Sequence, residues 1–213
     1  MPVAARDWDV FVTETLSQAT EDGADTQWIE SLSRHAAEKR HAAHQAATKA
    51  VLEPDFARFV IALLAWSRCG EVALRDGVAD RPLEALAPAM LLGLAKKVVK
   101  RAADSDVDDA ESLHALRKSA KKLRYGIEYL HGLYGHRAKR YHKRCDRLQK
   151  HLGDMNDLET ATRLGTELTE RGRMDLAPAL GLLAHWSERR LRKLRKRVDR
   201  VRSDFGRERP FWQ

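Results

Sequence analysis

The sequence runs Ser112-Leu113-His114-Ala115-Leu116-Arg117-Lys118-Ser119-Ala120-Lys121-Lys122-Leu123-Arg124-Tyr125 through the stretch that decides its fold class. Apolar residues in and after this stretch recur at intervals of three and four, which is the spacing of an amphipathic α-helix. The predicted core face of that helix consists of Leu116, Ala120, Leu123, Ile127 and Leu130. We therefore predict a helix over 108–135 that packs against other helices.

The opposite side of this helix carries the candidate anion-binding residues. At about 100° per residue, the narrow strip comprises His114, Lys118, Lys121 and Tyr125, with Arg117 and Lys122 on its flanks and Arg124 near the boundary with the core. Donors then repeat once per turn, about 5.4 Å apart. Lysine supplies a point charge, whereas arginine can give a phosphate two parallel hydrogen bonds. The strip therefore suits a linear polyanion.

Further basic residues extend the candidate site. Lys139, Lys143 and Arg147 follow at a spacing of four and form a second row on the next predicted helix. A solvated helix face explains this row about as well as ligand binding does. Arg40 and Arg190 complete the set of candidates, and for them pairing with neighbouring acidic residues is an equally good interpretation.

Positive charge is concentrated in two segments of the chain. The 213 residues include 39 Lys/Arg and 31 Asp/Glu. Residues 114–150 hold 12 Lys/Arg against 2 Asp/Glu, and residues 185–209 hold 11 against 4, so the remainder is acidic. Because like charges held close together destabilise a compact state, two such segments favour an anionic ligand over a pair of solvated faces.

The whole sequence predicts an all-α protein, because helical spacing recurs throughout and strand-like alternation is absent. We predict eight helices, at 5–22, 26–52, 54–75, 82–104, 108–135, 137–151, 155–172 and 175–205. Pro54 and Pro82 suit first helical turns. Asp154 and Asn156 are candidate N-caps after Gly153, which would separate the sixth helix from the seventh. Other predicted helix ends lie near Gly23, Gly77, Gly135 and Gly172.

An internal repeat is visible when the sequence is shifted against itself by 150 residues. Arg6-Asp7-Trp8-Asp9 then aligns with Asn156-Asp157-Leu158-Glu159, and Arg40 aligns with Arg190. A register shared by a turn and the helix that follows it predicts two copies of one unit, related by pseudo-symmetry. We interpret Asp7 and Asp157 as caps or inter-helix partners, since they would repel an anion.

Three motifs occur in the two halves. They are His114-x-x-Arg117-Lys118-x-x-Lys121-Lys122-Leu123-Arg124-Tyr125-x-x-Glu128, Leu148-Gln149-x-x-Leu152-Gly153-Asp154-x-Asn156-Asp157 and Arg6-Asp7-Trp8-Asp9-Val10. Together they resemble the CHAD domains, the conserved-histidine α-helical domains. The resemblance implies a helical bundle of two pseudo-symmetric halves around a basic groove that binds inorganic polyphosphate. It also implies one domain, with half-repeats at 1–80 and 81–205 and a tail at 206–213.

The resemblance further implies a His- and Arg-rich helix in front of the first half, equivalent to the helix at His114. This sequence starts after that point, so we expect a truncated first half in which part of the basic lining is missing. A homo-oligomer would compensate for the missing lining, and that alternative stays open.

Other kinds of site have weak support in the sequence. Cys69 and Cys145 lie far apart without a CxxC pattern, which excludes a cysteine-built zinc site and favours a reducing compartment. His41 and His44 are better explained as surface histidines than as metal ligands. No catalytic motif is present, so we expect neither enzyme activity nor a cofactor.

The sequence favours a cytoplasmic protein without membrane contact, and polyphosphate binding, which the resemblance implies, would place it at polyphosphate granules. It shows no signal peptide, and its longest nearly apolar run, 83–95, is too short to cross a bilayer.

Two alternatives to polyphosphate remain. A nucleic-acid-binding protein fits the charge but lacks a recognised motif, and a scaffold would contact acidic proteins. The tryptophans in predicted helices are expected to pack between helices.

Overall fold

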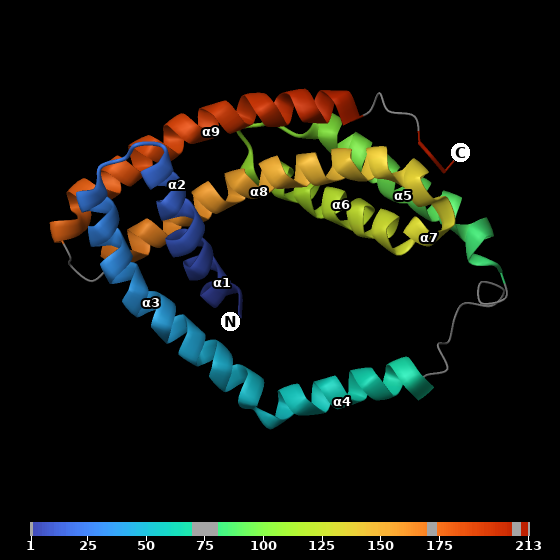
Figure 1. Cartoon of the computed structure of the whole chain (residues 1–213), viewed down its shortest axis with the longest axis horizontal. Coiled ribbons are helices and arrows are strands. Elements are labelled where there is room, and N and C mark those ends of the chain that lie inside the picture. The colour runs from blue at the N-terminus through green and yellow to red at the C-terminus, as the bar shows by residue number, and fades with distance from the viewer. Residues whose placement is uncertain (1, 70–80, 170–173, 206–209, 213) are drawn as a thin grey trace. The chain divides into compact units, whose positions relative to one another are not determined.

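The computed structural model describes residues 2–69, 81–169, 174–205 and 210–212. All regular secondary structure in these ranges is helical, which confirms the all-α prediction. The chain divides into two units, Met1–Arg75 with Asp157–Glu188, and Asp76–Asn156 with Arg189–Gln213. Neither unit is a continuous half of the sequence, because two long helices, α8 (Ala138–Thr169) and α9 (Ala177–Phe205), contribute to both (Figure 1).

The first unit is built on a helical hairpin. Its first arm is continuous and consists of α1 (Pro2–Val10), a π-helical turn (Phe11–Thr15) and α2 (Leu16–Glu21), and its second arm is α3 (Thr26–Leu52). Gly23 makes the turn between the arms with φ +81°, a conformation that glycine adopts readily. The hairpin core consists of Trp8, Phe11, Leu16, Trp28 and Leu32, all buried. Helix α4 (Pro54–Cys69) follows α3 after the extended residue Glu53.

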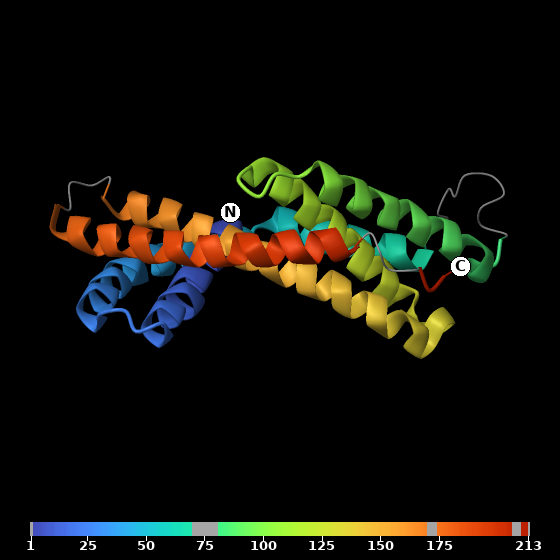
Figure 2. The same ribbon diagram turned by 90° about the horizontal axis from the view of Figure 1, so that it is seen from above.

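The second unit contains a second hairpin, made of α5 (Leu83–Asp104) and α6 (Ala110–Tyr129), which lie side by side (Figure 2). Asp109 caps α6, because its carboxylate accepts hydrogen bonds from the backbone N–H groups of Glu111 and Ser112. The five residues predicted as the core face of α6 are all buried, which confirms that stripe. Short turns, α7 (His131–Tyr134) and a 3-10 turn at Gly135–Arg137, lead into α8.

The predicted break between the sixth and seventh helices is wrong. Helix α8 runs through Gly153 without interruption, so Asp154 and Asn156 lie inside a helix and do not cap one. Leu148, Leu152, Met155 and Leu158 continue one buried stripe across the glycine. Burial of that stripe outweighs the cost of about 1 kcal/mol for a glycine in a helix interior.

Other helix ends also differ from the sequence prediction. The helix predicted over 108–135 stops at Tyr129, and Gly135 with φ +53° follows α7. Gly77, Gly172 and the end of the helix predicted to reach residue 75 lie outside the described residues. Trp66 was expected to pack between helices, but it is 58% exposed, whereas Trp8, Trp28 and Trp186 are buried as expected.

The internal repeat is visible in the helix bounds. A shift of 150 residues places α3 over residues 176–202, which nearly coincides with α9 (Ala177–Phe205), and places the α1–α2 arm over the second part of α8. Each copy therefore supplies a turn followed by a long helix. Leu194, Val198 and Phe205 of α9 are buried and form its packing stripe.

Candidate anion-binding site

Arg124 links α6 to α8 through hydrogen bonds. Its Nε donates to Oε1 of Gln149 at 2.8 Å, and its Nη1 donates to Oε1 of Glu128 at 2.5 Å. The same Glu128 oxygen lies 2.8 Å from Nε2 of His142 on α8. The side chain of Arg124 is only 18% exposed. Hydrogen bonds to charged groups are stronger than neutral ones, so this network fixes the register of the two helices.

A second contact lies about two turns along the same pair of helices. The Arg117 guanidinium lies against Gly153, with its Nε 3.9 Å from the position that a Cβ at residue 153 would occupy. Among the described atoms, Arg117 Nε is buried and has no hydrogen-bond partner. From Arg117 through Arg124 to Glu128 the residue numbers rise along α6. Those of their partners on α8 fall, from Gly153 through Gln149 to His142. The helices α6 and α8 are therefore antiparallel.

This register brings both predicted basic rows to one face of the α6–α8 pair. On α6 the buried residues lie to one side of Arg124, whereas His114, Lys118 and Lys121 lie about 60–120° to the other side at 100° per residue. On α8, angles around the helix axis measured from Gln149 at 100° per residue place Lys139 and Lys143 on the side away from the buried residues. Because the helices are antiparallel, these two sides coincide. Two cationic rows therefore flank the Arg117–Arg124 seam.

The predicted site residues differ in their exposure to solvent. The exposed ones are His114, Lys118, Lys121, Lys122, Lys139, Lys143 and Arg147. Tyr125 is 37% exposed and makes cation–π contacts, with Lys121 Nζ 5.6 Å and Arg124 Cζ 4.6 Å from its ring centre. Arg117 and Arg124 are half-buried in the seam. All ten residues belong to the second unit.

Arg40 belongs to the first unit and has an acidic partner. Its Nε donates to Oδ1 of Asp9 at 2.5 Å, and His44 Nε2 lies 2.9 Å from the same oxygen. These hydrogen bonds, first that with His44 and then that with Arg40, hold the pKa of Asp9 below its ordinary value of 3.8. Arg190, the repeat equivalent of Arg40, is also engaged by a neighbour. The pairing of Arg40 with an acidic residue is confirmed, and its partner Asp9 lies on the other arm of the hairpin.

Asp7 is an inter-helix partner, as predicted. Its Oδ2 accepts a hydrogen bond from Nη2 of Arg163 on α8 at 3.1 Å, and Arg163 also donates to Glu167 at 2.5 Å. The pair lies wholly within the first unit. Asp7 thus ties the α1 arm to α8 rather than facing a ligand.

Sequence reasoning missed Lys150 and the environment of His151. Lys150 is exposed and lies seven residues, or two turns, after Lys143, so the row could have been extended by spacing alone. Burial lowers the pKa of His151, Asp154 raises it, and the positive charges of Arg197, Lys150 and Arg147 lower it further. Arg197 lies on α9, so its effect on the pKa of His151 could be found only from the tertiary structure.

Other chemistry has little support in the described residues. No group of three or more His, Cys, Asp or Glu side chains there is placed to hold a metal ion. Cys145 is buried, and that burial raises the pKa of its thiol to about 12, so it is a poor nucleophile at neutral pH. His41 and His44 are exposed, which confirms their interpretation as surface histidines. None of the described helices is both long and apolar enough to cross a membrane.

The architecture is that of an all-helical bundle with long helices shared between two units. The family model of the CHAD domain matches residues 3–166, which is more than half of the chain. The protein therefore belongs to the CHAD family, and the resemblance noted in its three motifs is confirmed.

A solved CHAD structure supports the same assignment over nearly the whole chain. The crystal structure of the CHAD domain from the plant Ricinus communis is 30% identical in sequence and superposes with a TM-score of 0.81. The match covers 97% of this chain and 68% of the plant chain. No curated protein matches the sequence.

Removal of Arg124 is expected to weaken the fold. Arg124→Ala should lower the free energy of unfolding by about 2 kcal/mol, because it leaves Gln149 and Glu128 without their charged donor. Lys122→Ala, an exposed neighbour on the same helix, should change it by less than about 0.5 kcal/mol. Urea titration followed by circular dichroism measures both values. Equal midpoints for the two variants would show that Arg124 does not fasten the helices.

The Asp9 contact predicts a pH-dependent stability. Because the pKa of Asp9 is lower in the folded than in the unfolded protein, its contribution is present above pH 3.8 and is lost as the pH falls through the folded value. Asp9→Asn should therefore lower the urea midpoint at pH 7, and the difference from wild type should narrow in acid. Glu14→Gln, an exposed carboxylate on the same arm, is the control. A difference that is constant with pH would contradict the ion-pair interpretation.

Proposed function

We propose that this protein binds inorganic polyphosphate along the exposed face of the α6–α8 pair. The observation that supports this proposal best is the pair of cationic rows that flank the Arg117–Arg124 seam. Each row repeats a donor about once per turn, roughly every 5.4 Å. A flexible chain of phosphates can lie along the seam and meet charges from both sides.

The electrostatics of this face support an anionic ligand. Lys118, Lys121 and Lys122 are exposed, and in the described part of the chain none of them has an acidic partner. Residues 114–150 carry only Glu128 and Asp146 as negative charges, and Glu128 is already engaged by Arg124. A bound polyanion would relieve the mutual repulsion of these side chains. It would also supply acceptors to arginine, the residue suited to bidentate phosphate contacts.

The same face fits nucleic acid less well. Phosphate contacts alone give non-specific binding to DNA or RNA, but base reading requires Asn, Gln or Arg side chains aimed at base edges. Gln149 is held by Arg124, and Tyr125 lies against Lys121 and Arg124 rather than standing free as a stacking platform. A bare phosphate chain needs neither kind of contact.

We assign a binding role without catalysis. A hydrolase or kinase would need a nucleophile with a base, or a metal with an open position, and the cationic face consists of Lys, Arg and His with few carboxylates. Arg124 acts as a positioning residue and the exposed lysines act as ligands. We further propose that the protein is cytoplasmic and associates with polyphosphate granules through this face.

A competition titration tests the ligand. Labelled long-chain polyphosphate bound to the protein is displaced by unlabelled polyphosphate, double-stranded DNA or RNA at matched phosphate concentration and fixed salt, since affinity depends on salt. Polyphosphate should displace the label at a phosphate concentration at least tenfold lower than DNA or RNA. Equal displacement by DNA or RNA would overturn polyphosphate in favour of a nucleic-acid-binding surface.

A charge-reversal variant tests the face. Lys118→Glu with Lys122→Glu should abolish polyphosphate binding and leave the helical content unchanged, because both side chains are exposed. Lys96→Glu with Lys100→Glu on α5 is the matched control, since it has the same charge change at the same spacing on an exposed part of the same unit. Binding that survives the α6 variant, or is lost equally in both, would remove the α6 row from the site.

A further inference from the structure

Helix α6 meets α5 along a second seam, and two printed contacts define how the helices pair. Arg101 Nη1 donates to the backbone carbonyl oxygen of Ala115 at 2.9 Å. Further along the pair, a Cβ at Gly126 would lie 2.9 Å from Leu94 Cδ1, so the two helices approach closely there. Residue numbers fall along α5 as they rise along α6. The helices of this seam, both in the second unit, are therefore antiparallel (Figure 2).

Lys97 of α5 and Lys122 of α6 lie at nearly the same level of this seam. From the Leu94–Gly126 contact, at about 1.5 Å per residue, Lys97 lies about 4.5 Å and Lys122 about 6 Å along the pair in the same direction. About one turn further in that direction, Arg101 follows on α5 and Lys118 follows on α6. Basic residues of the two helices therefore lie opposite one another at two successive levels.

Both lysines lie at the outer edge of the seam. At about 100° per residue, Lys122 is within about 40° of the side of α6 that contacts α5, and Lys97 is about 40–60° from the side of α5 that contacts α6. Each is displaced away from the buried residues of its helix, such as Ala95 in α5 and Leu123 in α6. Because the helices are antiparallel, the two displacements are towards one face of the pair. Both lysines are exposed on that face.

No carboxylate balances these two charges within the described part of the chain. Neither Lys97 nor Lys122 forms an ion pair with a described residue. The carboxylates of α5 and α6 all lie six or more residues from the lysine on the same helix, and they are Glu84, Asp104, Glu111 and Glu128. Two ammonium groups at one level of a seam repel each other, and a bound anion relieves that repulsion.

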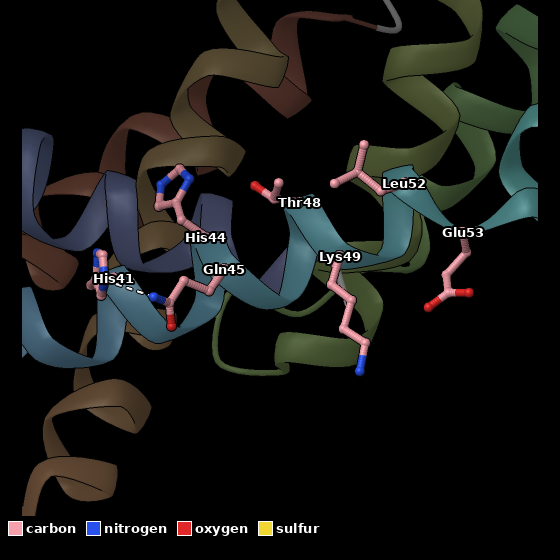
Figure 3. Close-up of a pocket in the computed structure, with 7 residues that line it drawn as sticks. All are labelled: His41, His44, Gln45, Thr48, Lys49, Leu52 and Glu53. Carbon is pink, nitrogen blue, oxygen red and sulfur yellow. Dashed lines mark hydrogen bonds between the residues drawn. The ribbon is translucent and has the colours of Figure 1, made fainter.

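Positive charge in the first unit has different surroundings. Lys49 and Glu53 both belong to the described lining of the hollow on α3 that Figure 3 shows, so a carboxylate accompanies the lysine there. His44 in the same lining lies 2.9 Å from Asp9 Oδ1. An anion would meet acidic groups in that hollow but not at Lys97 and Lys122. The α5–α6 seam is therefore the better anion site of the two.

We propose that Lys97 and Lys122 together bind phosphate groups at the outer edge of the α5–α6 seam. Lys97 is then a ligand that lies outside the α6–α8 face. This site rests on the proposed function, because its ligand is the same inorganic polyphosphate. Helix α6 has a seam on either side, since His114 and Lys121 lie towards α8 and Lys122 lies towards α5. A long polyphosphate chain therefore contacts α5 as well as α6 and α8.

Binding measurements on single variants test the site. Lys97→Glu should raise the dissociation constant of long-chain polyphosphate by about fivefold or more at fixed low salt, because it places a negative charge beside the bound phosphate. Lys96→Glu is the matched control. It makes the same charge change at the neighbouring exposed position, but it lies about 140° around α5 from Arg101. It should change the dissociation constant by less than about twofold, since interactions between separated exposed charges are largely screened.

Stability and additivity separate a ligand from a residue that only supports the fold. Lys97→Ala should weaken binding without lowering the urea midpoint of the free protein, because it removes a repulsion. Combined with Lys122→Ala, it should weaken binding by less than the product of the two single effects, because both side chains contact the same phosphate.

Several outcomes would overturn the site. Lys97→Glu could bind as the wild type does, or Lys96→Glu could lose as much affinity as Lys97→Glu. A lower urea midpoint for Lys97→Ala, or fully multiplicative effects of the two alanine variants, would also contradict shared phosphate binding. Each of these leaves the α6–α8 face standing as long as the wild type binds polyphosphate. A wild-type protein that does not bind polyphosphate would overturn the proposed function and this site with it.

Discussion

The contact of Arg124 with Gln149 and Glu128 is the constraint on which the cationic face depends. It sets the register of α6 against α8. A slip of one residue would rotate each basic row by about 100° and separate the rows. The buried stripe on the opposite side, from Leu116 to Ile127, fixes which side faces the solvent. One polar contact and one apolar stripe are therefore enough to turn a basic sequence into an ordered pair of rows.

Arginine and lysine have different tasks in this fold. Arg40, Arg163 and Arg202 each hold a group on another element: Asp9, Asp7 and the Ser105 carbonyl oxygen, respectively. Lys118 and Lys121 remain exposed. The planar guanidinium loses less freedom per hydrogen bond than the flexible ammonium does, so it suits fixed contacts between helices. The basic excess of the chain thus serves cohesion within the units and, through the lysines, the exposed face.

The sequence predicted most of the fold because most of it is local. The α6 stripe and the long last helix follow from periodicity. The α8 break was mispredicted because a Gly-Asp-x-Asn pattern at 153–156 resembles a helix start, and only tertiary burial of Leu152 and Met155 overrides it. The two rows were predicted separately. Their meeting on one face depends on Gln149 and Gly153, whose contacts with α6 cannot be read from spacing.

The repeat explains why symmetric sequence positions need not share a function. Arg40 and Arg190 align, and the acidic partner Asp9 of the first aligns with Glu159. The charges at these aligned positions are therefore the same in both copies. His44 and Leu194 also align, yet one is exposed beside Asp9 and the other is buried in the second unit. A residue carried over between halves therefore keeps its role only where its surroundings are also repeated. The surroundings of the α6–α8 face are not repeated around α3. Ligand binding by the second unit therefore gives no reason to assign the same ligand to Arg40.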